Sequence, residues 1–180
     1  MKFNDQQIAK ISTEVQNIVK GKVLFDHFSR GRYSTDSSLY QITPLGAVLP
    51  KDQNDVLNLM EYSQKNSIPL LARGGGSSQC GQTVGESIVL DYSKYQNQIL
   101  ELNVEEKYVW VQPGIVLDTL NAYLKPYGLW FPVDVSTSSR ATIGGMTGNN
   151  SCGSRSLYYG NMVNNVLAVE AILDLSLIHI

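Results

Sequence analysis

The 180-residue sequence is poor in charged residues of either sign. Asp, Glu, Lys and Arg make up 17% of the chain and the formal net charge is −2, whereas a typical globular domain has about 25% charged residues. Proteins that bind nucleic acid usually carry a surplus of basic residues, and a polybasic segment attracts a protein to an anionic membrane. Because the sequence has neither, we expect no nucleic-acid partner.

Cysteine and histidine are also scarce, with Cys80, Cys152, His27 and His179 the complete set. Two cysteines make no disulfide framework, which favours a reducing compartment and a cytoplasmic protein. With so few histidines a zinc site lacks its usual ligands, so we expect no metal. A Ser-His-Asp triad is equally hard to build, because His27 is the only sensible candidate for its histidine. No apolar run approaches the roughly 18 residues of a membrane span, and the N-terminus does not resemble a signal peptide. These exclusions leave a binding domain or an enzyme as the remaining classes of function.

The first half of the sequence has the pattern of a helix followed by a strand–helix–strand unit. Apolar residues at helical spacing predict a helix within residues 4–21, and the polar residues 27–38 are expected to form a loop. Short apolar runs at 47–49 and 68–72 predict strands, with a helix capped by Asp52 between them. Such a βαβ unit of about 30 residues is normally parallel, and ligands gather at the carboxyl ends of its strands.

The second half changes to short strands. Residues 87–91, 98–102 and 108–112 read as strands, the last two as a hairpin. A helix with Leu117, Leu120 and Leu124 on one face is predicted to follow and to end at Pro126 and Gly128. An apolar run at 166–173 predicts a buried strand. One βαβ unit mixed with antiparallel strands predicts an α+β fold.

A glycine- and serine-rich cluster, RGGGSSQCG, follows the second predicted strand at residues 73–81. Three successive glycines allow backbone angles in which consecutive N–H groups form a concave nest for an anion such as a pyrophosphate. A flexible turn is the alternative, and on local features alone the two stand level. The familiar nucleotide motifs fail, because Gln82 stands where Walker A needs lysine and Gln79 where the Rossmann fingerprint needs its third glycine.

A second cluster, PVDVSTSSRATIGGMTGNNSCGS, spans residues 132–154. Its glycines would weaken a helix and suit close approach of the backbone to a flat ligand or to another backbone. Its hydroxyls and the amides of Asn149 and Asn150 can donate and accept at the edge of a heterocycle. A long surface loop is the alternative, but loops of this length are usually functional or disordered, and Ile143 and Met146 argue against disorder. Ligand binding is favoured here.

The order of these motifs resembles the FAD-binding (PCMH-type) domain of the vanillyl-alcohol-oxidase-like flavoproteins. The branch it is most similar to contains FAD-linked D-2-hydroxyacid dehydrogenases, including D-lactate dehydrogenases and the FAD subunit of glycolate oxidase. The resemblance covers residues 33–173 and rests on five collinear motifs. These are VLPKDQNDV, RGGGSSQCG, VQPGIVLDTLN, FPVDVSTSSRATIGGMTGNNSCGS and YGNMVNNVLAVEAIL. It implies a fold with a βαβ subdomain and a second, mixed α/β subdomain.

The resemblance also assigns cofactor-binding residues. The first cluster would hold the FAD pyrophosphate, and the second would line the pyrophosphate and isoalloxazine. The first set is Arg73, Gly74, Gly75, Gly76, Ser77, Ser78, Gln79, Gly81 and Gln82. The second set is Pro132, Ser136, Thr137, Ser139, Thr142, Gly144, Gly145, Asn149, Ser151 and Gly153. Relatives with covalent flavin carry a histidine where this chain has Ser77, so the resemblance implies noncovalent FAD.

The implied reaction is oxidation of a D-2-hydroxy acid of the lactate, glycolate or 2-hydroxyglutarate type to a 2-oxo acid, by hydride transfer to flavin N5. A quinone, a cytochrome or an iron–sulfur module would accept the electrons. In the family, the base and the carboxylate clamp come largely from a following substrate domain. An alditol or sugar-lactone oxidase on the same scaffold and a non-enzymatic nucleotide-binding module are the alternatives.

These considerations predict three segments. Residues 1–32 would form an N-terminal helix and connector, and residues 33–174 an FAD-binding domain truncated at its C-terminus. The last residues, LSLIHI, resemble translated adapter sequence, so we expect 175–180 to be a non-native tail. A genuine short paralogue that ends in an added edge strand is the alternative. The fragment would be inactive alone, with its catalytic residues in the missing domain, and the full-length parent could lie at a membrane surface.

Overall fold

The computed structural model describes residues 3–173 and the backbone of residues 176–179. The chain divides into two units, Met1–Gln96 and Asn97–Ile180, which we describe separately as unit 1 and unit 2. The boundaries predicted at residues 32 and 174 stay predictions. The predicted tail lies partly outside the described residues.

Unit 1 is built on a sheet whose described strands run in the order β1-β2-β4-β3. The strands are β1 Lys22–Leu24, β2 Gly46–Leu49, β3 Leu70–Arg73 and β4 Ile88–Asp91. β2 and β3 both pair in parallel with β4, while β1 is antiparallel to β2. Every residue of β2 and β4 is buried, as expected for central strands covered on both faces. The predicted βαβ unit is confirmed, with β4 inserted between its two strands.

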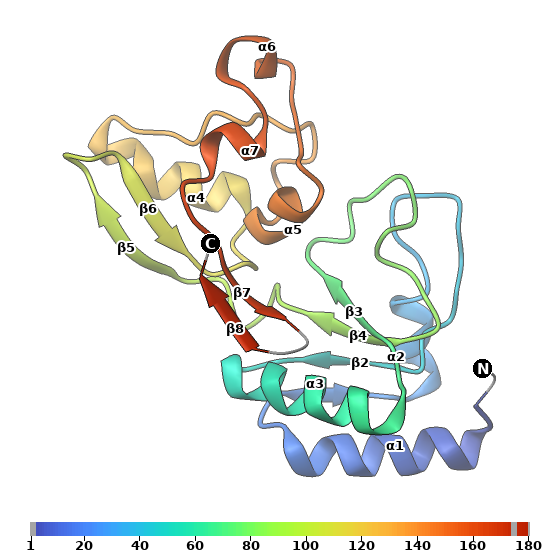
Figure 1. Cartoon of the computed structure of the whole chain (residues 1–180). Helices are drawn as coiled ribbons and strands as arrows, with labels where there is room; N and C mark the ends of the chain where they lie inside the picture. Colours follow the sequence, from blue (N-terminus) through green and yellow to red (C-terminus); the bar gives the residue numbers. More distant parts are fainter. Residues whose placement is uncertain (1–2, 174–175, 180) are drawn as a thin grey trace. The chain divides into compact units, whose positions relative to one another are not determined.

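The helices of unit 1 begin at capping residues that the sequence makes visible. The helices are α1 Asp5–Ile18, α2 His27–Arg32 and α3 Gln53–Asn66. Asn4 and Gln7 form a capping box at α1, and Asp52 accepts a hydrogen bond from the Asp55 N–H at the start of α3. α1 and α3 lie side by side (Figure 1).

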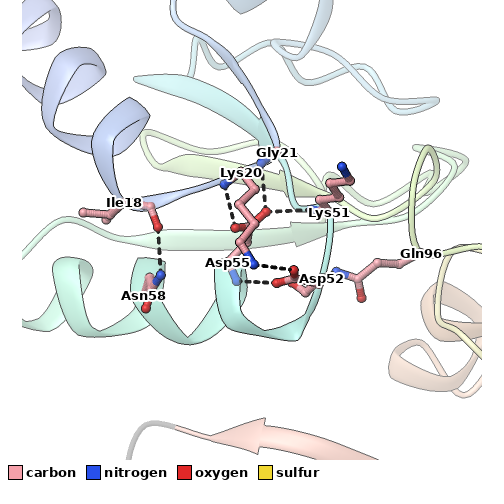
Figure 2. Close-up of polar contacts among 8 residues, drawn as sticks. All are labelled: Ile18, Lys20, Gly21, Lys51, Asp52, Asp55, Asn58 and Gln96. Carbon is pink, nitrogen blue, oxygen red and sulfur yellow. Dashed lines mark hydrogen bonds and ion pairs between the residues drawn. The ribbon is translucent and has the colours of Figure 1, made fainter.

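A buried carboxylate fastens the end of α1 to the start of α3 (Figure 2). Asp55 is 1% exposed and accepts hydrogen bonds from the backbone N–H groups of Lys20 at 2.8 Å, Gly21 at 2.9 Å and Lys51 at 2.8 Å. A Cβ atom at Gly21 would overlap the carbonyl oxygen of Leu49, so this junction requires glycine. A buried carboxyl group with three donors has a structural role, because backbone hydrogen bonds replace its contacts with water.

Unit 2 combines two hairpins with short helices. Its strands are β5 Ile99–Asn103, β6 Tyr108–Val111, β7 Glu170–Leu173 and β8 Ser176–His179, paired β5–β6 and β7–β8 in antiparallel fashion. Its helices are α4 Leu117–Leu124, the 3-10 turn η1 Lys125–Tyr127, α5 Ile143–Gly148, α6 Ser156–Tyr159 and α7 Met162–Asn165. Leu117, Val133, Ala141, Met146 and Met162 form one buried cluster. The hairpin and the helix that buries Leu117, Leu120 and Leu124 are as predicted, and the α+β class is confirmed.

Two local predictions are wrong. Residues 27–38 are not all loop, because Asp26 accepts a hydrogen bond from the Ser29 N–H and starts α2. The run 166–173 is not a buried strand, since only β7 is strand and Leu167 is 81% exposed. The glycines that were expected to weaken a helix at residues 143–148 still allow a short one, because α5 is capped by Thr142 and packs through Met146.

Candidate cofactor site

The first candidate region is the loop of residues 73–82, which leaves the carboxyl end of β3. Gly76 has a φ of 64° and Gly81 a φ of 75°, angles that residues with a Cβ atom rarely adopt. A Cβ atom at Gly76 would also lie 2.5 Å from Nη2 of Arg73, and one at Gly81 would lie 2.7 Å from the ring of Tyr40. The loop's own conformation therefore requires these two glycines.

The backbone of this loop presents a row of hydrogen-bond donors. The N–H groups of residues 74–79 donate no hydrogen bond to any residue that the structure describes. Gly75 and Gln79 are exposed, while Ser77 and Ser78 are half-buried. Backbone donors left without an internal partner are satisfied by solvent or by a ligand, and successive N–H groups of a glycine-rich turn suit an anion. This donor set fits a pyrophosphate.

Residues 33–41, here called the strap, hold this loop from one side. The Thr83 hydroxyl donates to the Asp36 carboxylate at 3.1 Å, and the Ser37 hydroxyl donates to the Gly76 carbonyl at 3.4 Å. Burial alone would raise the pKa of Asp36, but hydrogen bonds from Ser38 and Thr83 outweigh it and hold the pKa below its ordinary value. The sequence reading missed the strap, because its residues appeared as a polar connector with no motif to join them to the loop.

The second candidate region, residues 132–153, is folded into unit 2. Ser136 and Ser139 are exposed in the turn that precedes α5. Thr142 is 2% exposed and accepts a hydrogen bond from the Gly145 N–H at 3.3 Å, so it caps α5. Asn149 contacts the Ser151 hydroxyl at 3.3 Å. Capping thus occupies the Thr142 hydroxyl, whereas Ser136 and Ser139 remain accessible.

Two glycines of this region permit close approach to the chain's own backbone. A Cβ atom at Gly144 would lie 2.5 Å from the Pro113 Cβ and 2.9 Å from its carbonyl oxygen, which accepts a hydrogen bond from the Gly144 N–H at 2.8 Å. A Cβ atom at Gly153 would overlap both the backbone and the carboxylate of Asp134. Of the two explanations that the sequence left open for these glycines, another backbone is the one observed.

The carboxylate of Asp134 also holds the end of this region. It accepts hydrogen bonds from the Arg155 N–H at 3.0 Å and the Ser154 hydroxyl at 2.8 Å, and these lower its pKa. Nε of Arg155 lies 3.5 Å from the same carboxylate, and its guanidinium lies over the ring of Trp130. The charge of Arg155 is therefore already paired.

The predicted site residues fall into one set per unit. Residues 73–82 lie on a single loop of unit 1, and residues 132–153 occupy the turn, α5 and following loop of unit 2. Pro132 differs from the rest of its set, because it lines a hollow of about 300 Å³ together with Lys107, Trp130 and Phe131.

Within the described part of the chain, no group of three or more His, Cys, Asp or Glu side chains is arranged to hold a metal ion. None of the helices in that part is both long and apolar enough to cross a membrane.

Comparison with known proteins gives the family. Residues 44–178 match the protein family described as FAD binding domain. The chain is 43% identical over 157 residues to a D-2-hydroxyglutarate dehydrogenase of Pseudomonas putida, a match that covers 86% of this chain and 16% of the relative. It is 34% identical over 160 residues to the glycolate oxidase subunit GlcD of Bacillus subtilis, covering 86% of this chain and 34% of the subunit. The chain thus spans a small part of the length of these curated relatives.

Solved structures confirm the fold. An alkyldihydroxyacetonephosphate synthase matches with a TM-score of 0.83 at 19% identity, over 99% of this chain and 34% of that chain. The family match and the relatives confirm the resemblance seen in the five sequence motifs, and the donors of the 73–82 loop fit the pyrophosphate of the cofactor. The chain belongs to the FAD-binding domain family, and its cofactor is FAD.

Proposed function

We propose that this chain is the FAD-binding part of a flavin-dependent oxidoreductase that oxidises a D-2-hydroxy acid to a 2-oxo acid. The observation that carries the proposal is the row of backbone donors at residues 74–79, in a chain 43% identical to a D-2-hydroxyglutarate dehydrogenase. The relatives support the substrate class, because one acts on 2-hydroxyglutarate and another is a glycolate oxidase subunit by name.

In this proposal the backbone of residues 74–79 surrounds the pyrophosphate oxygens of FAD. Hydrogen bonds from backbone N–H groups to an ionised phosphate are charge-assisted and stronger than neutral ones. The hydroxyls of Ser77 and Ser78 add two side-chain donors to the same loop. Gly74 and Gly75 keep the backbone open to close approach, so the loop binds the anion without a lysine.

In this proposal the residues of the second region, 132–153, make a second set of contacts with FAD, distinct from those of residues 74–79. The exposed hydroxyls of Ser136 and Ser139 and the amide of Asn149 are the groups best placed by exposure to do so. Thr142, Gly144 and Gly153 contribute indirectly, because capping and close backbone packing fix the segment that carries the others.

The reaction divides between cofactor and protein. The chemistry that FAD supplies when bound is acceptance of a hydride at N5. The substrate must also lose its hydroxyl proton to a base and have its carboxylate held by a cation. We assign neither role to a described residue, and we propose that both lie on further sequence of the kind that the longer relatives possess. Noncovalent binding, a separate electron acceptor and a cytoplasmic location complete the proposal.

Cofactor binding is tested by the visible absorbance spectrum of the purified protein after incubation with FAD and desalting. We expect retained flavin bands that differ from those of free FAD. Gly75→Val, which places a branched side chain on the donor row, should lose them. Gly85→Ala is the matched control in unit 1, because its Cβ atom would make only ordinary contacts, 3.5 Å from Leu71 and 3.7 Å from the Ser87 hydroxyl. A folded, colourless wild-type protein would contradict the proposal for this chain.

The substrate class is tested in a fusion of residues 1–173 to the remaining sequence of the Pseudomonas putida relative. Under anaerobic conditions, D-2-hydroxyglutarate, D-lactate or glycolate should bleach the bound flavin if a D-2-hydroxy acid is the substrate. The relative itself serves as the positive control. Retained flavin that none of the acids bleaches would contradict the activity while leaving FAD binding intact.

A further inference from the structure

The guanidinium of Arg73 connects three parts of unit 1. Its Nη2 donates to the Thr35 carbonyl at 2.8 Å, and its Nη1 donates to the Thr83 carbonyl at 3.1 Å. Thr35 belongs to the strap, and Thr83 follows the glycine-rich loop directly. Arg73 itself ends β3. One planar group therefore joins the strand, the strap and the far end of the loop.

The loop also packs on this guanidinium. A Cβ atom at Gly76 would lie 2.5 Å from Nη2, 3.0 Å from Cζ and 3.1 Å from Nε of Arg73. Gly76 has a φ of 64°, so the loop takes a left-handed turn where it meets the guanidinium. The path of the 74–79 backbone is thus shaped against the Arg73 side chain.

The buried ring of Tyr33 packs against the guanidinium of Arg73. The Cζ atom of Arg73 lies 5.4 Å from the centre of the Tyr33 ring, a cation–π distance. The Tyr33 hydroxyl donates to the Asp91 carboxylate at 2.6 Å, and Ser93 donates to Asp91 through its N–H at 2.9 Å and its hydroxyl at 2.6 Å. Burial, together with Asp91, raises the pKa of Tyr33, so the phenol stays a neutral donor. The ring is therefore fixed to β4, the strand paired with β3.

We propose that Arg73 is a positioning residue for FAD, which acts through the shape of the 74–79 backbone. The inference rests on the proposed function, because it assumes that this backbone holds the pyrophosphate. An arginine is required because its planar fork reaches two carbonyl groups that face it from different segments. A lysine would keep the charge and lose this double attachment.

The Arg73→Lys variant distinguishes a positioning role for Arg73 from direct contact between its charge and the phosphates of FAD. We expect FAD to bind roughly tenfold more weakly, by the same factor at low and high salt, because loss of one charge-assisted hydrogen bond has about this effect. We also expect lower backbone ¹⁵N order parameters for residues 74–83 in the cofactor-free protein. Arg32→Lys is the matched control, because Arg32 is exposed and its Cζ atom lies 5.9 Å from the same Tyr33 ring.

The two readouts separate the possible outcomes. Order parameters equal to wild type, or FAD affinity equal to wild type, would overturn the positioning role. A loss of affinity that depends on salt, with unchanged order parameters, would assign Arg73 to direct contact with phosphate instead. Failure of the wild-type protein to bind FAD would overturn the proposed function, and the order parameters would still report whether Arg73 shapes the loop. Thermal unfolding of each variant confirms that unit 1 is folded.

Discussion

The two glycine-rich regions use glycine for different reasons. On the 73–82 loop, Gly76 and Gly81 take left-handed angles, and the N–H groups of residues 74–79 have no partner in the described chain. In residues 132–153, Gly144 and Gly153 allow one stretch of backbone to lie against another. Most backbone donors of α5 and its flanks are used internally, for example Ser151 to the Met146 carbonyl at 2.9 Å. The backbone donors of residues 74–79 are therefore available to a ligand, whereas most of those in α5 and its flanks already form hydrogen bonds within unit 2.

This difference separates binding from folding in the candidate site. Substitutions on the loop should weaken FAD binding with little loss of stability, because the loop's donors contribute nothing to the internal hydrogen bonds. Substitutions at the packing glycines of the second region should lower stability first, and cofactor binding only as a consequence.

Gly144→Val should destabilise unit 2 most strongly. Its Cβ atom would lie 2.5 Å from the Pro113 Cβ and 2.9 Å from its Cα, so backbone must move at a cost of about 3 kcal/mol or more. Urea unfolding followed by circular dichroism measures the loss. Gly148→Ala is the control in the same helix, because nothing lies within 4 Å of its Cβ position, and it should change stability by at most about 1 kcal/mol. Equal effects of the two variants would remove the distinction between packing and open glycines.

Asp55 in unit 1 and Asp134 in unit 2 should also differ in how much each contributes to stability. Asp55→Ala removes the acceptor of three backbone N–H groups at a 1% exposed position and should cost about 3 kcal/mol. Asp134→Ala removes the acceptor of the Arg155 N–H and Ser154 hydroxyl near solvent, where water replaces the lost partner. Its unfolding midpoint should move much less. An Asp134 variant as unstable as the Asp55 variant would show that unit 2 depends on this carboxylate.

Much of the fold could be predicted because single side chains specify it locally. Asp52 caps a helix where expected, and the two short strands predicted at 98–102 and 108–112 form the observed hairpin. Two features of the fold were not predicted from the sequence. Propensity argued against a helix at 143–148, which exists because Met146 is buried in the unit 2 core. The insertion of β4 between β2 and β3 depends on pairing between distant residues, which no local pattern reports.

Part of the candidate site could also be predicted, because that part is specified by neighbouring residues in the sequence. The glycine-rich loop could be found because consecutive glycines and serines are contiguous in the sequence. Its supports could not, because Thr35, Asp36 and Tyr33 lie about 40 residues away and contact it only in the folded chain. Arg73 was grouped with the FAD contacts by the resemblance, whereas its bonds to two carbonyl groups appear only in the structure.

Hydrogen exchange should show the contrast between the regions directly, without any substitution. In cofactor-free protein the amides of residues 74–79 should exchange rapidly, because they have no internal acceptor. The amides of Met146 and Ser151, bonded at 2.8 and 2.9 Å, should already be protected. Saturating FAD should slow exchange on the loop and change Met146 and Ser151 little. If added FAD protected Met146 and Ser151 while the loop stayed unchanged, the roles of the regions would be reversed.

The smallest expected effect concerns the pH dependence of the strap. The folded-state pKa of Asp36 lies below its ordinary value, because hydrogen bonds from Ser38 and Thr83 outweigh its burial. A group with a lowered folded pKa contributes stability above its unfolded pKa, about 4 for aspartate, and loses it as the pH falls through the folded value. Wild type should therefore be slightly more stable than Asp36→Asn near neutral pH. This difference should shrink in acid, as measured by urea midpoints between about pH 6 and about pH 3. A difference that stays constant over this range would show that the Asp36 charge does not fasten the strap, leaving Arg73 as the principal connection between strap and loop.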